Sequence, residues 1–202
     1  MYSSFHSDSL SDEFIRNHIF TDYQYKGLVI EVGGGSPDTI SFSKHWRNNG
    51  WRSIVFEPNP NYYNEFLKQD LECYNLACSD KDDQDVDFSI VNCNNELSYT
   101  SLGIRYDCFD AEKFVVDKIK VNTIRLKTFL KQNKIDKIDI LSIDVEGWEL
   151  EVMKGFDPTT VDCQIIILEN FQHDPSYTVF MENIGYKLVI ENKHDYIYEK
   201  IK

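Results

Sequence analysis

The stretch Leu28-Val29-Ile30-Glu31-Val32-Gly33-Gly34-Gly35-Ser36-Pro37-Asp38 decides the fold. Its first five residues are mostly apolar and predict a buried strand, and the three glycines after them predict a tight turn. Such a turn brings backbone N–H groups close to a ligand. Pro37 stands where the first residue of a helix is favourable. With the carboxylates of Glu31 and Asp38 beside it, this turn suits a ligand with a positive centre and hydroxyls better than a pyrophosphate.

The chain after this turn alternates between helix and strand patterns. The expected elements are a helix over residues 37–49, a strand over 53–57, a helix after Pro60 and a strand over 71–76. With the first strand they make a β-α-β-α-β pattern, which predicts parallel strands joined by right-handed crossovers.

The second half of the chain is less regular. We expect strands over residues 86–90, 121–126, 138–143 and 161–168, helices over 128–134, after Trp148 and over 177–183, and an antiparallel hairpin of 186–191 with 195–199 at the sheet edge. Residues 92–118 show no clear periodicity, so we expect a long loop beside the active face that contacts the acceptor or acts as a lid. A merely irregular surface loop explains this stretch equally well. Residues 1–26 predict a loose lead-in followed by a helix, and residues 1–202 are expected to form a single domain.

Composition limits the classes of function. The 202 residues are 42% hydrophobic and carry a net charge of −13, and a field of that sign disfavours nucleic acid as a partner. The sequence shows no apolar run of membrane-spanning length and no signal peptide at its start, so a cytoplasmic location is expected. Five cysteines without a C-x-x-C pair indicate neither a disulfide framework nor a zinc site. The oligomeric state is left open.

Acidic residues lie at the carboxyl ends of four expected strands. They are Glu31, Glu57, Asp144 with Glu146, and Glu169. Ligands of open parallel sheets bind at the carboxyl ends of the strands, and acids at the ends of buried strands are costly unless they bind something. One such acid has an ordinary explanation as a helix cap, whereas four along one edge predict a ligand site.

Glu57 lies 22 residues beyond Gly35, at the position where a carboxylate binds a ribose diol. NAD and S-adenosylmethionine both present such a diol. Gly33 and Gly35 fit the dinucleotide pattern G-x-G-x-x-G, but Asp38 occupies its last position and would repel a pyrophosphate. The spacing therefore favours S-adenosylmethionine.

Over about residues 27–170 the chain resembles the FkbM family of S-adenosylmethionine-dependent methyltransferases. The segments that carry the resemblance are Ile30-Glu31-Val32-Gly33-Gly34-Gly35, Gly50-Trp51-Arg52, Phe56-Glu57-Pro58-Asn59-Pro60, Asn75-Leu76-Ala77, and Leu141-Ser142-Ile143-Asp144-Val145-Glu146-Gly147-Trp148-Glu149 with Leu150-Glu151-Val152-Met153-Lys154-Gly155-Phe156. The resemblance implies an α/β, Rossmann-like class I methyltransferase fold. This fold has a mostly parallel seven-stranded sheet, an antiparallel C-terminal hairpin and helices on both faces.

The resemblance also implies where the cofactor lies. The glycine turn would hold the methionine part of S-adenosylmethionine, the end of the second strand its ribose, and the end of the third strand its adenine. The residues expected to contact the cofactor are Glu31, Gly33, Gly34, Gly35, Asp38, Glu57, Pro58, Ala77 and Asp144.

The implied reaction is O-methylation of a hydroxyl of a sugar or small polyol, in a glycan or a glycosylated small molecule. A hydroxyl is a weak nucleophile, so a base or a metal must help to remove its proton. The candidate catalytic residues are Asp144, Glu146 and His173, and the candidate ligands of a Mg²⁺ ion are Asp144, Glu169 and Asn170, similar to the set in catechol-type O-methyltransferases.

Ordinary roles explain the same residues. Asp144 and Glu146 are well placed to cap or position the next helix, Asn170 to satisfy loop backbone, and His173 to face solvent. Two other functions also stay open, an NAD-dependent oxidoreductase on a similar sheet and a non-catalytic nucleotide-binding module.

Overall fold

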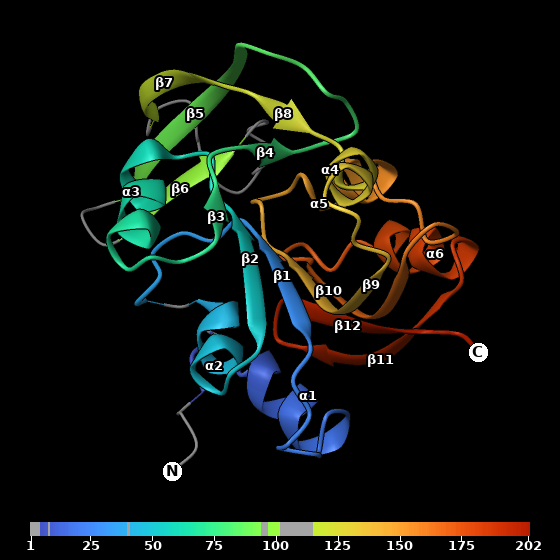
Figure 1. Cartoon of the computed structure of the whole chain (residues 1–202). Coiled ribbons are helices and arrows are strands. Elements are labelled where there is room, and N and C mark those ends of the chain that lie inside the picture. The colour runs from blue at the N-terminus through green and yellow to red at the C-terminus, as the bar shows by residue number, and fades with distance from the viewer. Residues whose placement is uncertain (1–4, 8, 40, 94–96, 102–114) are drawn as a thin grey trace.

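The computed structural model describes residues 5–7, 9–39, 41–93, 97–101 and 115–202. Its main sheet has seven strands (Figure 1). In spatial order these are β11 (Tyr186–Asn192), β12 (Asp195–Lys200), β10 (Asp162–Glu169), β9 (Lys137–Ile143), β1 (Leu28–Val32), β2 (Arg52–Phe56) and β3 (Cys73–Tyr74). All pairings among β3, β2, β1, β9 and β10 are parallel. Strand β12 runs antiparallel to β10 and β11, which confirms the expected C-terminal hairpin at the sheet edge.

Helices cover both faces of this sheet (Figure 1). On one face lie α1 (Ser11–His18) and α2 (Phe42–Asn48), and on the other lie α4 (Leu126–Gln132), α5 (Glu149–Lys154) and α6 (Ser176–Asn183). Helix α3 (Pro60–Lys68) joins β2 to β3.

The two faces follow from the alternation of side chains along each strand. In β10, Ile165 and Ile167 pack with Trp46 of α2, whereas Ile166 and Leu168 pack with the α4–α6 side. Because both sets are apolar, the central strands are buried on both faces, as parallel sheets require. The carboxyl edge is then the part of the sheet where polar side chains of the strands gather.

The helix after the glycine turn begins later than the sequence predicts. We expected it from residue 37, but α2 starts at Phe42. The carboxylate of Glu31 accepts the N–H of Phe42 at 2.8 Å and thereby satisfies the first turn of a helix that starts there. Pro37 lies outside the helix, and its carbonyl oxygen accepts a hydrogen bond from the guanidinium of Arg47.

The expectation of one long loop over residues 92–118 is wrong where the structure describes the chain. Strands β5 (Val86–Cys93), β6 (Leu97–Ser101) and β7 (Val115–Val121) form a separate antiparallel sheet in the order β6-β5-β7. Residues 94–96 and 102–114 of the expected loop lie outside the described residues. The pairing of β5 with β7 joins distant segments, so periodicity within one short segment did not show it.

Two further expected strands are shorter or divided. The strand expected over 71–76 is β3, only two residues long, and a turn then leads to β4 (Ala77–Cys78). The strand expected over 121–126 divides into the end of β7 and β8 (Thr123–Ile124), which pairs in parallel with β4. None of the helices in the described part of the chain has the length and apolar character needed to cross a bilayer.

Candidate functional site at the carboxyl edge of the sheet

The glycine turn packs tightly against the ends of two neighbouring strands. The N–H groups of Gly33 and Gly34 donate to the carbonyl oxygen of Phe56, at 3.0 and 3.2 Å. Gly33 has a φ of +87°, and a β-carbon added there would lie 1.7 Å from the carbonyl oxygen of Asp144. A β-carbon on Gly35, by contrast, would meet open space. The turn therefore fixes its first two glycines to the sheet and leaves the third with room beside it.

Glu57 joins this turn to the end of β2. Its side chain is buried, with Oε2 accepting the N–H of Gly35 and Oε1 that of Asn59, both at 2.7 Å. Burial raises the pKa of Glu57 to about 8. Each carboxylate oxygen has a second lone pair for another donor. The Asn75 side chain fixes the adjoining backbone, since it donates to the carbonyl oxygens of Glu57 and Pro58 at 2.9 Å.

Glu31 is also buried, but its oxygens bind the start of α2. Besides the N–H of Phe42, it accepts the hydroxyl of Ser43 at 2.5 Å, and burial raises its pKa. Its negative charge nevertheless reaches Glu57, whose pKa it helps to raise. Glu31 therefore caps α2, and it affects Glu57 beside the glycine turn through its charge.

Asp38 and Ala77 occupy different surroundings. The Asp38 side chain is 63% exposed, lies 3.5 Å from the ammonium of Lys44 and accepts a hydrogen bond from Gln69 at 2.7 Å. Ala77 is buried in β4, where its N–H donates to the carbonyl oxygen of Asn122. The structure thus brings Gly33, Gly34, Gly35, Glu57 and Pro58 into one unit and places Asp38 on the exposed side of its loop.

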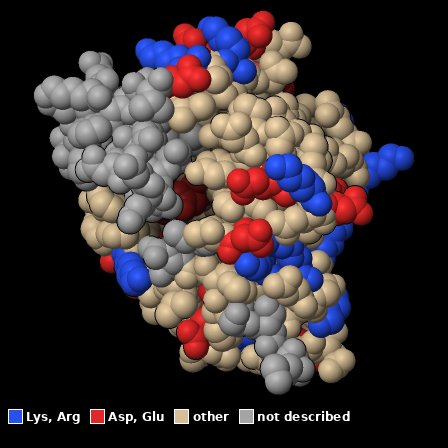
Figure 2. All heavy atoms as spheres, turned by 90° about the vertical axis from the view of Figure 1, so that its left-hand side faces the viewer, with Lys and Arg blue, Asp and Glu red and all other residues tan. Residues whose placement is uncertain are grey.

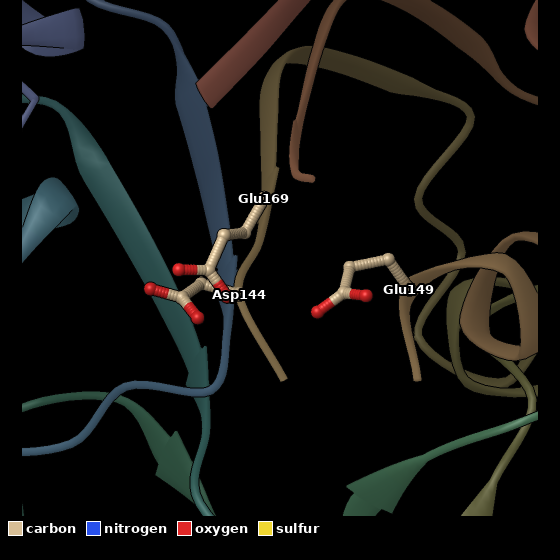
Figure 3. A group of neighbouring side chains, drawn as sticks. All are labelled: Asp144, Glu149 and Glu169. Atoms are coloured by element: carbon tan, nitrogen blue, oxygen red, sulfur yellow. The ribbon is translucent and has the colours of Figure 1, made fainter. Parts of the chain in front are cut away.

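Three carboxylates converge at the ends of β9 and β10. Asp144 directly follows β9, Glu169 ends β10 and Glu149 begins α5. One oxygen of each lies within 4.8 Å of the others. Figure 3 shows Asp144 and Glu169 side by side, with Glu149 reaching toward them from α5. Acidic atoms are also visible at the bottom of a hollow in the space-filling view (Figure 2).

The convergence changes how these acids ionise. Asp144 keeps contact with solvent although protein surrounds it on most sides. This surrounding protein, followed by the negative charges of Glu169 and Glu146, raises the pKa of Asp144 well above its ordinary value. Burial and the charge of Glu146 raise the pKa of Glu169 to about 8, although a hydrogen bond from Asp144 opposes the shift. Asp144 and Glu169 therefore form a hydrogen-bonded pair that holds a proton near neutral pH.

The alternation of side chains along the strands places these acids on the same face of the sheet. Val29 and Ile167 pack on the α1–α2 side, and Glu31 and Glu169 follow them by two residues. Glu57 and Asp144 each come after a residue that packs on the opposite side, so the alternation also places them on the α1–α2 side. The interactions at this edge form two pairs: the charge of Glu31 acts on Glu57, and oxygens of Asp144 and Glu169 lie within 4.8 Å of each other.

Asn170 and His173 form other contacts. Asn170 is buried, and its amide exchanges two hydrogen bonds with the backbone of Asp174, at 2.9 and 3.0 Å. His173 Nδ1 lies 2.9 Å from the hydroxyl of Tyr196, which packs on the α4–α6 side of the sheet. The hydrogen bonds of both residues therefore close the loop after β10, and His173 is not part of the group formed by the three carboxylates.

Two acids that the sequence analysis did not select belong to this site. Glu149 accepts the N–H groups of Val145 and Gly147, and its position two residues after the glycine of the Asp-Val-Glu-Gly block was the available signal. Asp195 lies opposite Glu169 in the β10–β12 pairing, and its charge raises the pKa of both Glu169 and Asp144. Only the register of the hairpin reveals Asp195.

Comparison with known proteins places this geometry in a family. A family model described as the methyltransferase FkbM domain matches residues 31–198. The crystal structure of precorrin-6y C5,15-methyltransferase from Geobacter metallireducens GS-15 is similar at a TM-score of 0.45 and 12% identity, over 98% of this chain and 93% of that chain. A comparison with curated protein sequences finds no match. The seven-stranded α/β sheet is the Rossmann-like class I methyltransferase fold, and the chain belongs to the FkbM family of methyltransferases.

Proposed function

We propose that this methyltransferase transfers the methyl group of S-adenosylmethionine to a hydroxyl of a sugar, in a glycan or a glycosylated small molecule. The observation that carries the proposal is the convergence of the Asp144 and Glu169 carboxyl groups beside the glycine turn. A hydroxyl must lose a proton to become methylated, and this pair supplies a proton acceptor at the edge where ligands of such sheets bind.

The residues around the glycine turn fit the proposed cofactor. The space beside Gly35 admits a ligand against the backbone, and the Glu57 carboxylate has lone pairs for the two ribose hydroxyls. When bound, S-adenosylmethionine supplies a methyl carbon activated by a positively charged sulfur. A ligand with that positive charge lowers the pKa of Glu57 and of the acidic pair, so their ionised forms would favour its binding.

Asp144 and Glu169 then act on the acceptor. As the hydroxyl oxygen forms its bond to the methyl carbon and the carbon–sulfur bond breaks, the hydroxyl proton passes to this pair. Because the pKa of Glu169 is about 8, mildly alkaline solution provides the deprotonated base that the step needs. Glu146 adds negative charge next to both acids and strengthens the base.

A divalent ion is a second way to assist the same step. The three converging carboxylates offer the hard oxygens that Mg²⁺ prefers, and a Mg²⁺ ion held by Asp144 and Glu169 would lower the pKa of a bound hydroxyl. Two observations favour the proton acceptor over the ion. Both oxygens of Glu149 already accept hydrogen bonds, and so does the amide oxygen of Asn170.

The negative charge of the site limits the classes of sugar that can be the acceptor. Four acids, Glu146, Glu149, Glu169 and Asp195, each raise the pKa of Asp144, so all four lie near it. The ionised members of this group repel a phosphorylated or carboxylated sugar, and bringing a second anion near them is unfavourable. We therefore expect a neutral or amine-bearing sugar, and the net charge of −13 also disfavours nucleic acid.

The test is methyl transfer with S-adenosylmethionine labelled with ¹³C in its methyl group. The acceptors are matched neutral sugars, amino sugars and sugar phosphates, and NMR of the products identifies the atom that carries the label. The proposal predicts an O-methyl product from the neutral or amino sugars and none from the phosphates. Label on nitrogen or carbon, or calorimetric binding of NADH without binding of S-adenosylhomocysteine, would contradict it.

A further inference from the structure

The carboxylate of Glu149 joins the turn after β9 to two helices. Glu149 is fully buried at the start of α5, and its Oε1 accepts the N–H groups of Val145 at 3.1 Å and Gly147 at 3.0 Å. Its Oε2 accepts the hydroxyl of Tyr177, on α6, at 2.7 Å. All of these contacts lie within the protein, so the side chain acts on the chain around it.

The turn that Glu149 holds has an unfavourable backbone conformation. Glu146 has a φ of +60° and Gly147 a φ of +92°. Side chains other than glycine rarely adopt a left-handed conformation, and it persists where the surroundings enforce it. The turn also follows Asp144 directly, so its shape decides where the Asp144 carboxyl group points.

We propose that Glu149 is a positioning residue for methyl transfer: its buried carboxylate holds residues 145–147 and thereby keeps Asp144 aimed at Glu169. The arrangement in Figure 3 fits this role, because Glu149 approaches the other two acids from a different element. The effect of Glu149 on methyl transfer rests on the proposed function, whereas its stabilisation of residues 145–147 does not.

NMR-detected hydrogen exchange of the Val145 and Gly147 amides measures how strongly Glu149 stabilises the turn. The variants are Glu149→Ala, Glu149→Gln and, as a charge-matched control on the exposed side of α6, Glu182→Gln. We expect the alanine variant to lose protection at both amides. The glutamine variant should keep it because its amide oxygen still accepts both N–H groups. If the alanine variant does not fold, Glu149→Asp replaces it, since the shorter side chain cannot reach both amides.

The catalytic consequence is measured as a split between kcat and KM. Misplacing Asp144 should lower kcat by about 10²-fold in the alanine or aspartate variant. The KM for S-adenosylmethionine should change by less than about threefold because the glycine turn is intact. Glu149→Gln should restore most of kcat, and the control should match the wild-type protein.

Each result decides a distinct claim. Protection that survives Glu149→Ala, or a kcat that survives the loss of protection, would overturn the positioning role. A glutamine variant as slow as the alanine variant would also overturn it, because the charge rather than the hold would then matter. If the wild-type protein transfers no methyl group to any alcohol, the proposed function fails, and the exchange measurement still decides whether Glu149 holds the turn.

Discussion

The carbonyl oxygen of Asp144 lies 1.7 Å from where a β-carbon of Gly33 would stand. In the same place the N–H of Asp144 donates to the carbonyl oxygen of Val32 at 3.0 Å. The end of β1 and the end of β9 are therefore in direct backbone contact at the site. The glycine turn that we assign to the cofactor is therefore in contact with the backbone of Asp144, whereas the direction of the Asp144 side chain also depends on the turn that follows it.

This contact predicts different costs for two glycine substitutions. Gly33→Ala must push the end of β9 away, and we expect it to lower the free energy of unfolding by roughly 3 kcal/mol or more. Gly35→Ala has room for its β-carbon but keeps a φ of +52°, so we expect a loss of roughly 1–2 kcal/mol. Urea unfolding of both variants measures the difference. Equal losses would show that the close approach of Gly33 to Asp144 does not constrain the fold.

Glu57 should control the affinity for the nucleoside part of the cofactor. Replacing Glu57 by Gln keeps the shape of the side chain and removes the carboxylate, whose ionised form the ribose hydroxyls would stabilise by donating hydrogen bonds. Because hydrogen bonds to charged groups contribute about 1.5–3 kcal/mol, we expect binding of S-adenosylhomocysteine to weaken by about 10- to 100-fold. Isothermal titration calorimetry measures the change, with Glu182→Gln on the exposed side of α6 as the control. Unchanged affinity in Glu57→Gln would exclude a ribose contact.

Stability should decrease as pH rises through the neutral range. Burial raises the pKa of Glu57 and of Glu169 to about 8 in the folded protein, against an ordinary value of 4.5. Between these values the folded protein holds more protons than the unfolded chain, so raising the pH favours unfolding. We expect the melting temperature to fall between pH 6 and pH 8.5, measured by circular dichroism.

The same reasoning predicts the effect of removing one of the two acids. Glu169→Gln cannot ionise, so it should flatten the decline of melting temperature with pH and be most stabilising at pH 8.5. A variant with the same slope as the wild-type protein would show that Glu169 does not hold its proton in the folded state.

Removal of divalent ions distinguishes the two ways of assisting the hydroxyl. With Asp144 and Glu169 acting as a proton acceptor, EDTA should leave the rate of methyl transfer unchanged and added Mg²⁺ should not increase it. The measurement is the initial rate before EDTA, after EDTA and after dialysis with Mg²⁺. A rate abolished by EDTA and recovered with Mg²⁺ would assign the acids to a metal ion instead.

Much of the fold is visible in the sequence because its signals are local. The apolar run before Gly33 and the run before Glu169 became β1 and β10, and the C-terminal hairpin formed where its two alternating segments predicted it. The start of α2 was not predictable in this way. It depends on Glu31 in the preceding strand accepting the N–H of Phe42, which is a contact that spacing alone does not specify.

The candidate site was predictable where residues follow strand ends. Glu57, Asp144 and Glu169 come at the carboxyl ends of parallel strands, so the fold class was enough to bring them to one edge. Asp195 was not predictable because only the β10–β12 register places it beside Glu169. The contact of the His173 ring with Tyr196 of the hairpin was not predictable either, because only the fold brings these two residues together.

The most direct test of the account is the single-turnover rate of methyl transfer to a hydroxyl of a neutral or amino sugar. The wild-type protein is compared with Glu169→Gln and Asp144→Asn, with Glu182→Gln as the control. We predict that the wild-type rate rises with pH up to about 8, as the acidic pair loses its proton, and that both site variants lose about 10²- to 10⁴-fold without this dependence. Site variants that transfer the methyl group at the wild-type rate, with the wild-type dependence on pH, would contradict it.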